Sequence, residues 1–231
     1  MKLLTRLLPL ILVAACSGLE EGEGGVVAIE VETPEFPTLE VGEQEQVVAR
    51  ALDLNGQVVD VPLEWQSTTA AVTVNGTGLV TGSQPGEADV QAFSGSLPSE
   101  PVSFEVVLRA DTIIIAGDSV FTLATGVEPP PTATLTVRLE TFTPPGPISG
   151  RPVIFEITSP TPGLTDTAVV QLVGGVQSDT ITTGTDGTAI AEIGAVSQQV
   201  PPDTAIVQVR AERTRGAPVP GSGQRFIVLF Q

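Results

Sequence analysis

The segment that decides the fold is Pro85-Gly-Glu-Ala-Asp-Val-Gln-Ala-Phe93. Within it, Ala88, Val90 and Ala92 alternate with polar residues. A period of two puts the small apolar residues on one face of an extended strand and the polar residues on the other. The segment therefore predicts a β-strand with one face against a core and one face in water.

The same alternation recurs along the chain, and no window of about a dozen residues shows a 3.6-residue period with helix caps. Short apolar runs separated by Gly, Pro, Asn and Asp predict an all-β protein built as antiparallel sandwiches. The further alternating segments are 134–140, 153–157 and 205–211.

Turn dipeptides separate the predicted strands. Asn55-Gly56 lies between the run ending at Leu54 and the run beginning at Gln57, which predicts a two-residue hairpin loop. The other turn signals are Asn75-Gly76, Pro85-Gly86 and Asp186-Gly187.

The amino-terminal segment has the features of an export signal. Lys2 and Arg6 precede an apolar run, and two alanines precede Cys16, the single cysteine of the chain. The run is far shorter than the ~20 residues that span a bilayer. Its ending, Val13-Ala14-Ala15-Cys16, resembles the lipobox of bacterial lipoproteins, which implies a signal peptide at residues 1–15 and lipidation of Cys16.

This resemblance also implies where the protein is located and how it is attached. By family resemblance, an aspartate after the cysteine favours inner-membrane retention, and Ser17 stands there. We therefore expect export and anchoring in the bacterial envelope, more in the outer than in the inner membrane. Residues 16–25 are acidic and rich in glycine, which predicts a flexible tether.

Two domains are predicted, at 26–109 and 110–231, because a new series of strands starts after the run 102–108. The first resembles the bacterial immunoglobulin-like domain of group 2, with Trp65 expected in the core between two sheets. The matching segments are 39–42, 47–56, 63–67, 72–74, 78–82 and 85–92.

The second domain resembles the group 1 bacterial immunoglobulin-like domain of invasin- and intimin-type proteins. The matching segments are Ile148–Phe155 and Thr182–Ala191. Proline-rich inserts at 128–131 and 143–147 and a long segment, Gly216–Gly223, depart from the family pattern. The resemblances imply two tandem immunoglobulin-like antiparallel β-sandwiches. Because the run 102–108 ends shortly before the next strands start at Thr112, we expect the two domains to stack end to end with limited swing.

Composition excludes several function classes. The formal net charge is −17, with eight arginines spread from Arg50 to Arg225, so nucleic-acid binding is not expected. The chain contains no histidine and no tyrosine. With the cysteine blocked, neither nucleophilic triads nor zinc sites can form, so no enzyme activity, catalytic residue, cofactor or metal site is predicted. Asp53 and Asp186 resemble parts of calcium loops only faintly, and turn chemistry is favoured there.

The sequence thus predicts a non-enzymatic structural or adhesive module held at the envelope by its lipid. The alternatives are a carbohydrate- or cell-wall-binding lipoprotein and an accessory subunit of an envelope assembly. Besides the membrane, a protein or carbohydrate ligand at the cell surface is the expected partner. The segments 143–150 and 216–223 are the exposed loops where recognition is expected first.

Overall fold

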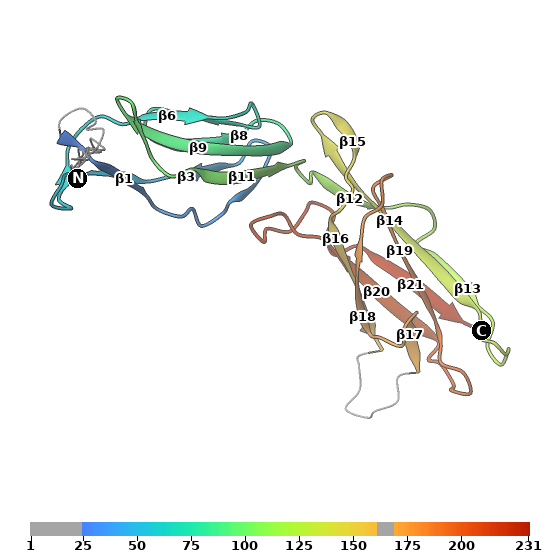
Figure 1. Ribbon diagram of the computed structural model, residues 1–231. Coiled ribbons are helices and arrows are strands. Elements are labelled where there is room, and N and C mark those ends of the chain that lie inside the picture. Colours follow the sequence, from blue (N-terminus) through green and yellow to red (C-terminus); the bar gives the residue numbers. More distant parts are fainter. Residues whose placement is uncertain (1–24, 161–168) are drawn as a thin grey trace, which may run out of the picture.

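A computed structural model describes residues 25–160 and 169–231. These residues form two β-sandwiches and no α-helix (Figure 1). The prediction of an all-β chain of two immunoglobulin-like sandwiches is confirmed. In the described part of the chain, no helix has the length and apolar character needed to cross a membrane.

The N-terminal sandwich has two layers. One layer contains the sheets β1-β4-β5 and β3-β8-β7, which continue one another because β3 and β4 are almost contiguous. The other contains β10-β9-β11-β2, with β6 paired to β9. The strands are β1 (Ala28–Val31), β2 (Thr38–Glu40), β3 (Gln44–Gln46), β4 (Ala49–Leu52), β5 (Val58–Val59), β6 (Glu64–Ser67), β7 (Val72–Val74), β8 (Leu79–Gly82), β9 (Gly86–Ser94), β10 (Leu97–Pro98) and β11 (Val102–Val107).

The core of the N-terminal sandwich follows the predicted alternation. In β9, Ala88, Val90 and Ala92 are all buried. Trp65 is only partly buried, but it packs against both apolar clusters of this sandwich and so joins them. Its ring also lies against Gly78, where an added Cβ would come within 2.8 Å of the indole.

The C-terminal sandwich has the layers β12-β14-β19-β17, with β15 paired to β14, and β13-β21-β20-β16-β18. The strands are β12 (Thr112–Ile115), β13 (Val120–Leu123), β14 (Thr132–Phe142), β15 (Pro145–Pro147), β16 (Pro152–Ser159), β17 (Val170–Leu172), β18 (Ser178–Thr182), β19 (Thr188–Ala195), β20 (Thr204–Arg210) and β21 (Arg225–Phe230).

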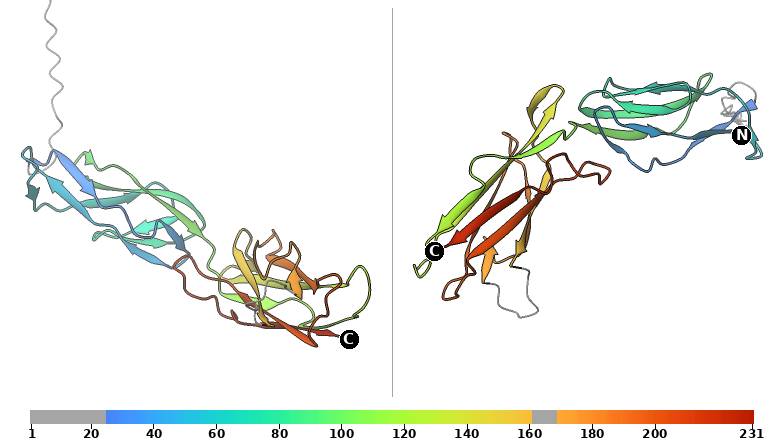
Figure 2. Two further views of the ribbon diagram at one scale, coloured as in Figure 1. Left: turned by 90° about the horizontal axis from the view of Figure 1, so that it is seen from below. Right: turned by 180° about the vertical axis from the view of Figure 1, so that it is seen from behind.

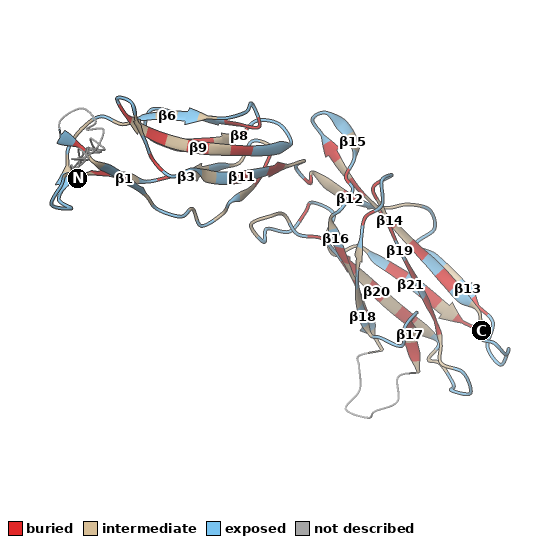
Figure 3. Cartoon of the chain, viewed as in Figure 1, coloured by how far each residue is buried: buried red, intermediate tan, exposed pale blue. Residues whose placement is uncertain are grey.

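The apolar positions predicted from period-two patterns all face the interior of this second sandwich, as the alternating burial along the strands shows (Figure 3). Phe155 of β16 and Phe226 of β21 are its largest fully buried side chains. Among the described residues, no apolar cluster contains buried residues of both sandwiches. Each sandwich therefore has a core of its own.

In both sandwiches the chain passes from one layer to the other after the first strand. β1 pairs with β4 in one layer, whereas β2, the next strand, pairs in parallel with β11 in the other. β12 and β13 repeat this arrangement with β14 and β21. These parallel pairs are short, and the other strand pairs are antiparallel.

The prediction of a two-residue loop at Asn55-Gly56 is wrong. The hairpin is present, but Asp53 N–H bonds to Gln57 O and Gly56 N–H bonds to Asp53 O, with Gly56 at a φ of 74°. This is a type I turn followed by a left-handed glycine, and it needs a longer loop. The same pair of hydrogen bonds closes the turns whose left-handed glycines are Gly78, Gly175, Gly187 and Gly216.

The two sandwiches lie end to end with a bend between them (Figure 2). β11 ends at Val107 and β12 begins at Thr112, so four residues connect them. Residues between β20 and β21 extend back from the C-terminal sandwich toward β3 and β11 (Figure 1). The contact between the sandwiches is therefore made by this segment as well as by the connection.

Candidate functional site: the joint between the sandwiches

Three glutamates at the end of the N-terminal sandwich form one half of the contact. Glu40 ends β2, and a tight turn through Gly42 leads to Glu43. Glu43 N–H donates to Glu40 O, and Glu40 N–H donates to the Oε2 atom of Glu43, each at 2.8 Å. Because these two bonds lock the turn, both carboxylates are held toward the C-terminal sandwich.

Glu45 in β3 is positioned from its other side. Its Oε1 atom accepts the backbone N–H groups of Glu35 and Phe36, at 3.2 and 3.4 Å. Its Oε2 atom is thereby free to face Arg215, whose Nη2 lies 3.0 Å away.

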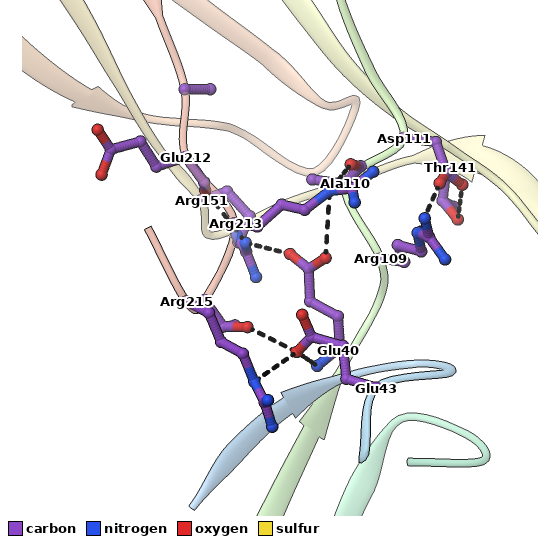
Figure 4. Close-up of polar contacts among 12 residues, drawn as sticks. Glu40, Glu43, Arg109, Ala110, Asp111, Thr141, Arg151, Glu212, Arg213 and Arg215 are labelled. Atoms are coloured by element: carbon purple, nitrogen blue, oxygen red, sulfur yellow. Dashed lines mark hydrogen bonds and ion pairs between the residues drawn. The ribbon is translucent and has the colours of Figure 1, made fainter. Parts of the chain in front are cut away.

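The other half is a hairpin at residues 211–219, which we name the arginine hairpin. Glu212 and Pro218 form an isolated bridge, and Arg213 N–H bonds to Ala217 O across the turn. This turn places Arg213, Thr214 and Arg215 at the tip. All three contact the glutamates. We name these three residues, the three glutamates and Arg151 together the joint; Figure 4 labels all of them except Glu45 and Thr214.

The base of the arginine hairpin is held on the C-terminal sandwich. Val219 is buried, and Ile113 N–H of β12 donates to Pro220 O. At Gly221 an added Cβ would lie 2.2 Å from Ile113 O, so only glycine permits this close approach. The hairpin therefore leaves the sandwich from a fixed base.

The most buried contact of the joint is the ion pair of Glu40 with Arg151. The Nη2 atom of Arg151 is 2.6 Å from Glu40 Oε1, and the two side chains are 12% and 1% exposed. Arg213 Nε lies 3.7 Å from the other oxygen, Glu40 Oε2, and donates to Ala110 O at 3.1 Å. One carboxylate thus faces two guanidinium groups.

Arg215 makes the outer contact of the joint. It donates to Gln44 O at 2.7 Å and pairs with Glu45, and its guanidinium carbon lies 4.7 Å from the centre of the Phe36 ring. Thr214 Oγ1 is 3.0 Å from Glu43 Oε2. These contacts are more exposed than the Glu40 pair, so solvent weakens them.

The connection itself is also tied down. Arg109 Nε is 3.1 Å from Asp111 Oδ1, while Asp111 Oδ2 accepts Phe142 N–H at 2.7 Å. The chain that leaves β11 is thus bonded to β14 as soon as it enters the C-terminal sandwich.

This arrangement is suited to holding an orientation. Moving two charges out of water costs nearly as much as their attraction returns, so a buried pair adds little net free energy. An orientation that kept Glu40 buried but moved both guanidinium groups away would, however, cost about 3–5 kcal/mol. The joint therefore selects one orientation of the two sandwiches.

The structure bears on only some of the sites predicted from the sequence. Cys16, the signal peptide at 1–15 and all of the tether except Gly25 lie outside the described residues. Part of the segment 143–150 forms β15, which pairs with β14. The segment 216–223 is mostly exposed, as expected, with Val219 as its one buried residue. Its first four residues belong to the arginine hairpin, and a recognition role for it stays a prediction.

Asp53 and Asp186 act as turn residues, as predicted. Asp53 Oδ1 accepts the N–H groups of Gln57 and Asn55, and these bonds lower the pKa of Asp53. The hydroxyl and the N–H of Thr188 lower the pKa of Asp186 in the same way. In residues 25–160 and 169–231, no three His, Cys, Asp or Glu side chains gather as metal ligands.

The sequence patterns did not reveal the joint. They showed the arginines as spread along the chain, whereas three of them converge on three glutamates. One signal was present: Glu40, Glu43 and Glu45 are close in sequence, and Arg213 and Arg215 are two positions apart between the alternating segment 205–211 and the segment 216–223. Only the fold shows that these two clusters meet.

Comparison with known proteins bears on the N-terminal sandwich. Residues 26–103 match the family model of the bacterial Ig-like domain, group 2, as the sequence predicted. No curated protein matches the chain. The resemblance of residues 110–231 to group 1 domains stays a prediction.

Solved structures similar to this chain include two bacterial adhesins. Adhesin InvE of Yersinia pseudotuberculosis is 16% identical with a TM-score of 0.43, and 91% of this chain and 61% of that chain are covered. The Escherichia coli adhesin FdeC is 16% identical with a TM-score of 0.49, and 87% of this chain and 63% of that chain are covered. Domains 4 and 5 of the S-layer protein SbsC are 15% identical, with a TM-score of 0.34 and coverage of 89% and 98%. The chain thus spans less than two thirds of either adhesin chain.

Proposed function

We propose that this chain is a lipid-anchored, non-enzymatic envelope protein that acts as a spacer with an adhesive outer end. Its two immunoglobulin-like domains would divide at residues 109 and 110. The observation that carries the proposal is the joint, in which buried ion pairs hold two separately packed sandwiches in one extended arrangement. A spacer needs that property, because a freely swinging connection would not hold the outer domain away from the membrane.

The proposed anchor is the lipidated Cys16. A single acyl chain binds a membrane only weakly and reversibly, so stable residence requires more than one chain on this residue. With Ser17 after the cysteine, we place the anchor in the outer membrane. The tether at 16–25 would then separate the first domain from the bilayer.

The anchor is tested by replacing Cys16 with Ser and Ser17 with Ala in separate variants. We expect fatty-acid labelling and membrane sedimentation of the wild-type chain and of Ser17→Ala. Cys16→Ser should remain an unprocessed precursor without label. A labelled and normally processed Cys16→Ser variant would contradict the anchor.

The adhesive part is tested on cells that express the chain. We expect these cells to attach to surfaces coated with extracellular protein or polysaccharide more than cells that express Cys16→Ser. Equal attachment of both would contradict adhesion while leaving the anchor and the spacer intact.

A further inference from the structure

A groove of about 630 Å³ runs between the edges of the two layers of the N-terminal sandwich. β1 forms one wall and the start of β11 forms the other. Its floor includes Ile29, which is buried, and the partly buried Val31 and Val102. No residue of the joint lines the groove, so a binding role for the groove is independent of the proposed function.

The β1 wall presents free backbone groups. Within residues 25–160 and 169–231, β1 pairs only with β4, and Glu32 N–H donates to Val48 O. In an antiparallel pair, alternate residues point their backbone groups toward the partner strand. Because the backbone N–H of Glu32 points toward β4, the N–H and C=O groups of Ile29 and Val31 point the other way, toward the groove.

The start of β11, which forms the opposite wall, has unpaired backbone groups because Pro37 ends its pairing with β2. β11 pairs with β2 only from Glu105 onward, where Glu105 N–H donates to Pro37 O. The next bond of this parallel ladder would need a donor at residue 37, and proline has none. Ser103 therefore also leaves its backbone groups toward the groove.

The charge of the groove selects its occupant. Glu32 is paired with Arg50, whereas Glu30 and Glu100, both exposed, take part in no ion pair among the described residues. A second copy of this chain, at a net charge of −17, and the tether, which carries three glutamates, would both be repelled. A segment with positive charge from another protein would be attracted.

We propose that this groove binds an extended, positively charged peptide segment of a partner protein by β-strand addition to β1. Main-chain bonds to Ile29 and Val31 hold the added strand. Its apolar side chains pack on the floor near Val102, and its basic side chains face Glu30 and Glu100.

The test is a calorimetric titration of the full chain, in a zwitterionic detergent, with the peptide acetyl-Lys-Val-Thr-Val-Lys-Val-Thr-amide. We expect binding of this peptide, and no binding of twins with Glu in place of Lys or with alternate N-methylated amides. Glu30→Gln with Glu100→Gln should weaken affinity about three- to tenfold, since each exposed charge contributes modestly.

Val31→Pro removes the N–H that faces the groove and should weaken binding at least about tenfold. Val58→Pro is the matched control at the opposite edge of the same sheet. Its N–H also points away from β4, since Asp53 and Gln57 form the bonded pair, so binding should persist.

Equal binding of the peptide to wild type and Val31→Pro would overturn the proposal, as would equal binding of the N-methylated twin or no binding to wild type. Self-association that Val31→Pro abolishes would show that a second copy is the occupant, and would overturn it as well. If Val31→Pro does not fold, the double glutamine variant and the twin peptides decide.

Discussion

Glu40 is the residue on which the orientation of the two sandwiches depends. Its carboxylate is fully buried in a chain that already carries a large negative charge, and it is tolerated because Arg151 and Arg213 surround it. Other ion pairs, such as Arg210 with Glu156, are exposed on the surface and contribute at most about 1 kcal/mol.

Glu40→Gln should lower the free energy of unfolding by up to about 3–5 kcal/mol, because it leaves two guanidinium groups without their carboxylate. Glu156→Gln is the matched control and should cost no more than about 1 kcal/mol. Denaturant unfolding of both variants checks this. Equal costs would show that burial of Glu40 has no energetic consequence.

Asp53 links the stability of one hairpin to pH. Its folded-state pKa is lowered by two backbone N–H groups, so the carboxylate stabilises the turn above about pH 4, the range of an ordinary aspartate. That contribution is lost as pH falls through the lowered pKa. We expect the amide NMR signals of Asn55 and Gln57 to titrate with a midpoint below that of a free aspartate.

In Asp53→Asn this step should disappear while the turn persists. The hairpin at Asn75 shows why, since the side-chain oxygen of Asn75 accepts the N–H groups of Thr77 and Leu79 without a charge. A midpoint above the usual aspartate range in the wild-type chain would contradict the assignment.

At the scale of elements, one turn design recurs through both sandwiches. Each turn ends in a left-handed glycine, but the glycines differ in their surroundings. An added Cβ at Gly78 would lie 2.5 Å from Val47 O and 2.8 Å from the Trp65 ring, whereas at Gly216 it would meet nothing within 4 Å.

Gly78→Ala should therefore cost about 2–4 kcal/mol of unfolding free energy, from left-handed strain together with overpacking. Gly216→Ala should cost about 1–2 kcal/mol from strain alone. Gly76→Ala, without a positive φ or a close neighbour, should change it by less than about 1 kcal/mol. Thermal unfolding of the three variants checks the order, and equal costs at Gly78 and Gly76 would contradict it.

At the scale of the whole molecule, the joint works against a general repulsion. Both sandwiches carry more acidic than basic residues, so the mean field drives them apart. The ion pairs of the joint oppose this repulsion, and two of their arginines, Arg213 and Arg215, come from the arginine hairpin.

Arg213→Gln with Arg215→Gln should widen the distribution of distances between the sandwiches without unfolding either, since each has its own core. Fluorescence energy transfer between labels at the exposed positions 60 and 199 measures this. Arg225→Gln, at the start of β21, is the matched control and should leave the distribution unchanged. An unchanged distribution in the double variant would show that the connection alone sets the orientation.

The strands and the type of fold could be read from local patterns. Alternating residues such as Leu135, Val137 and Leu139 reveal a strand because each position reports its own face. The exact loops were less accessible, since Asn55-Gly56 fits two turn types and the pairing of β4 with β5 decides between them.

The joint and the groove depended on tertiary structure. Arg151 and Glu40 are 111 positions apart, and Thr214 and Glu43 are 171 positions apart. No local sequence period predicts contacts between such distant residues, because these contacts depend on how the two folded sandwiches are joined. The free edge of β1 likewise exists only because the chain changes layers before β2. Local chemistry thus sets each strand, and the assembly of the strands decides which charges and which edges face one another.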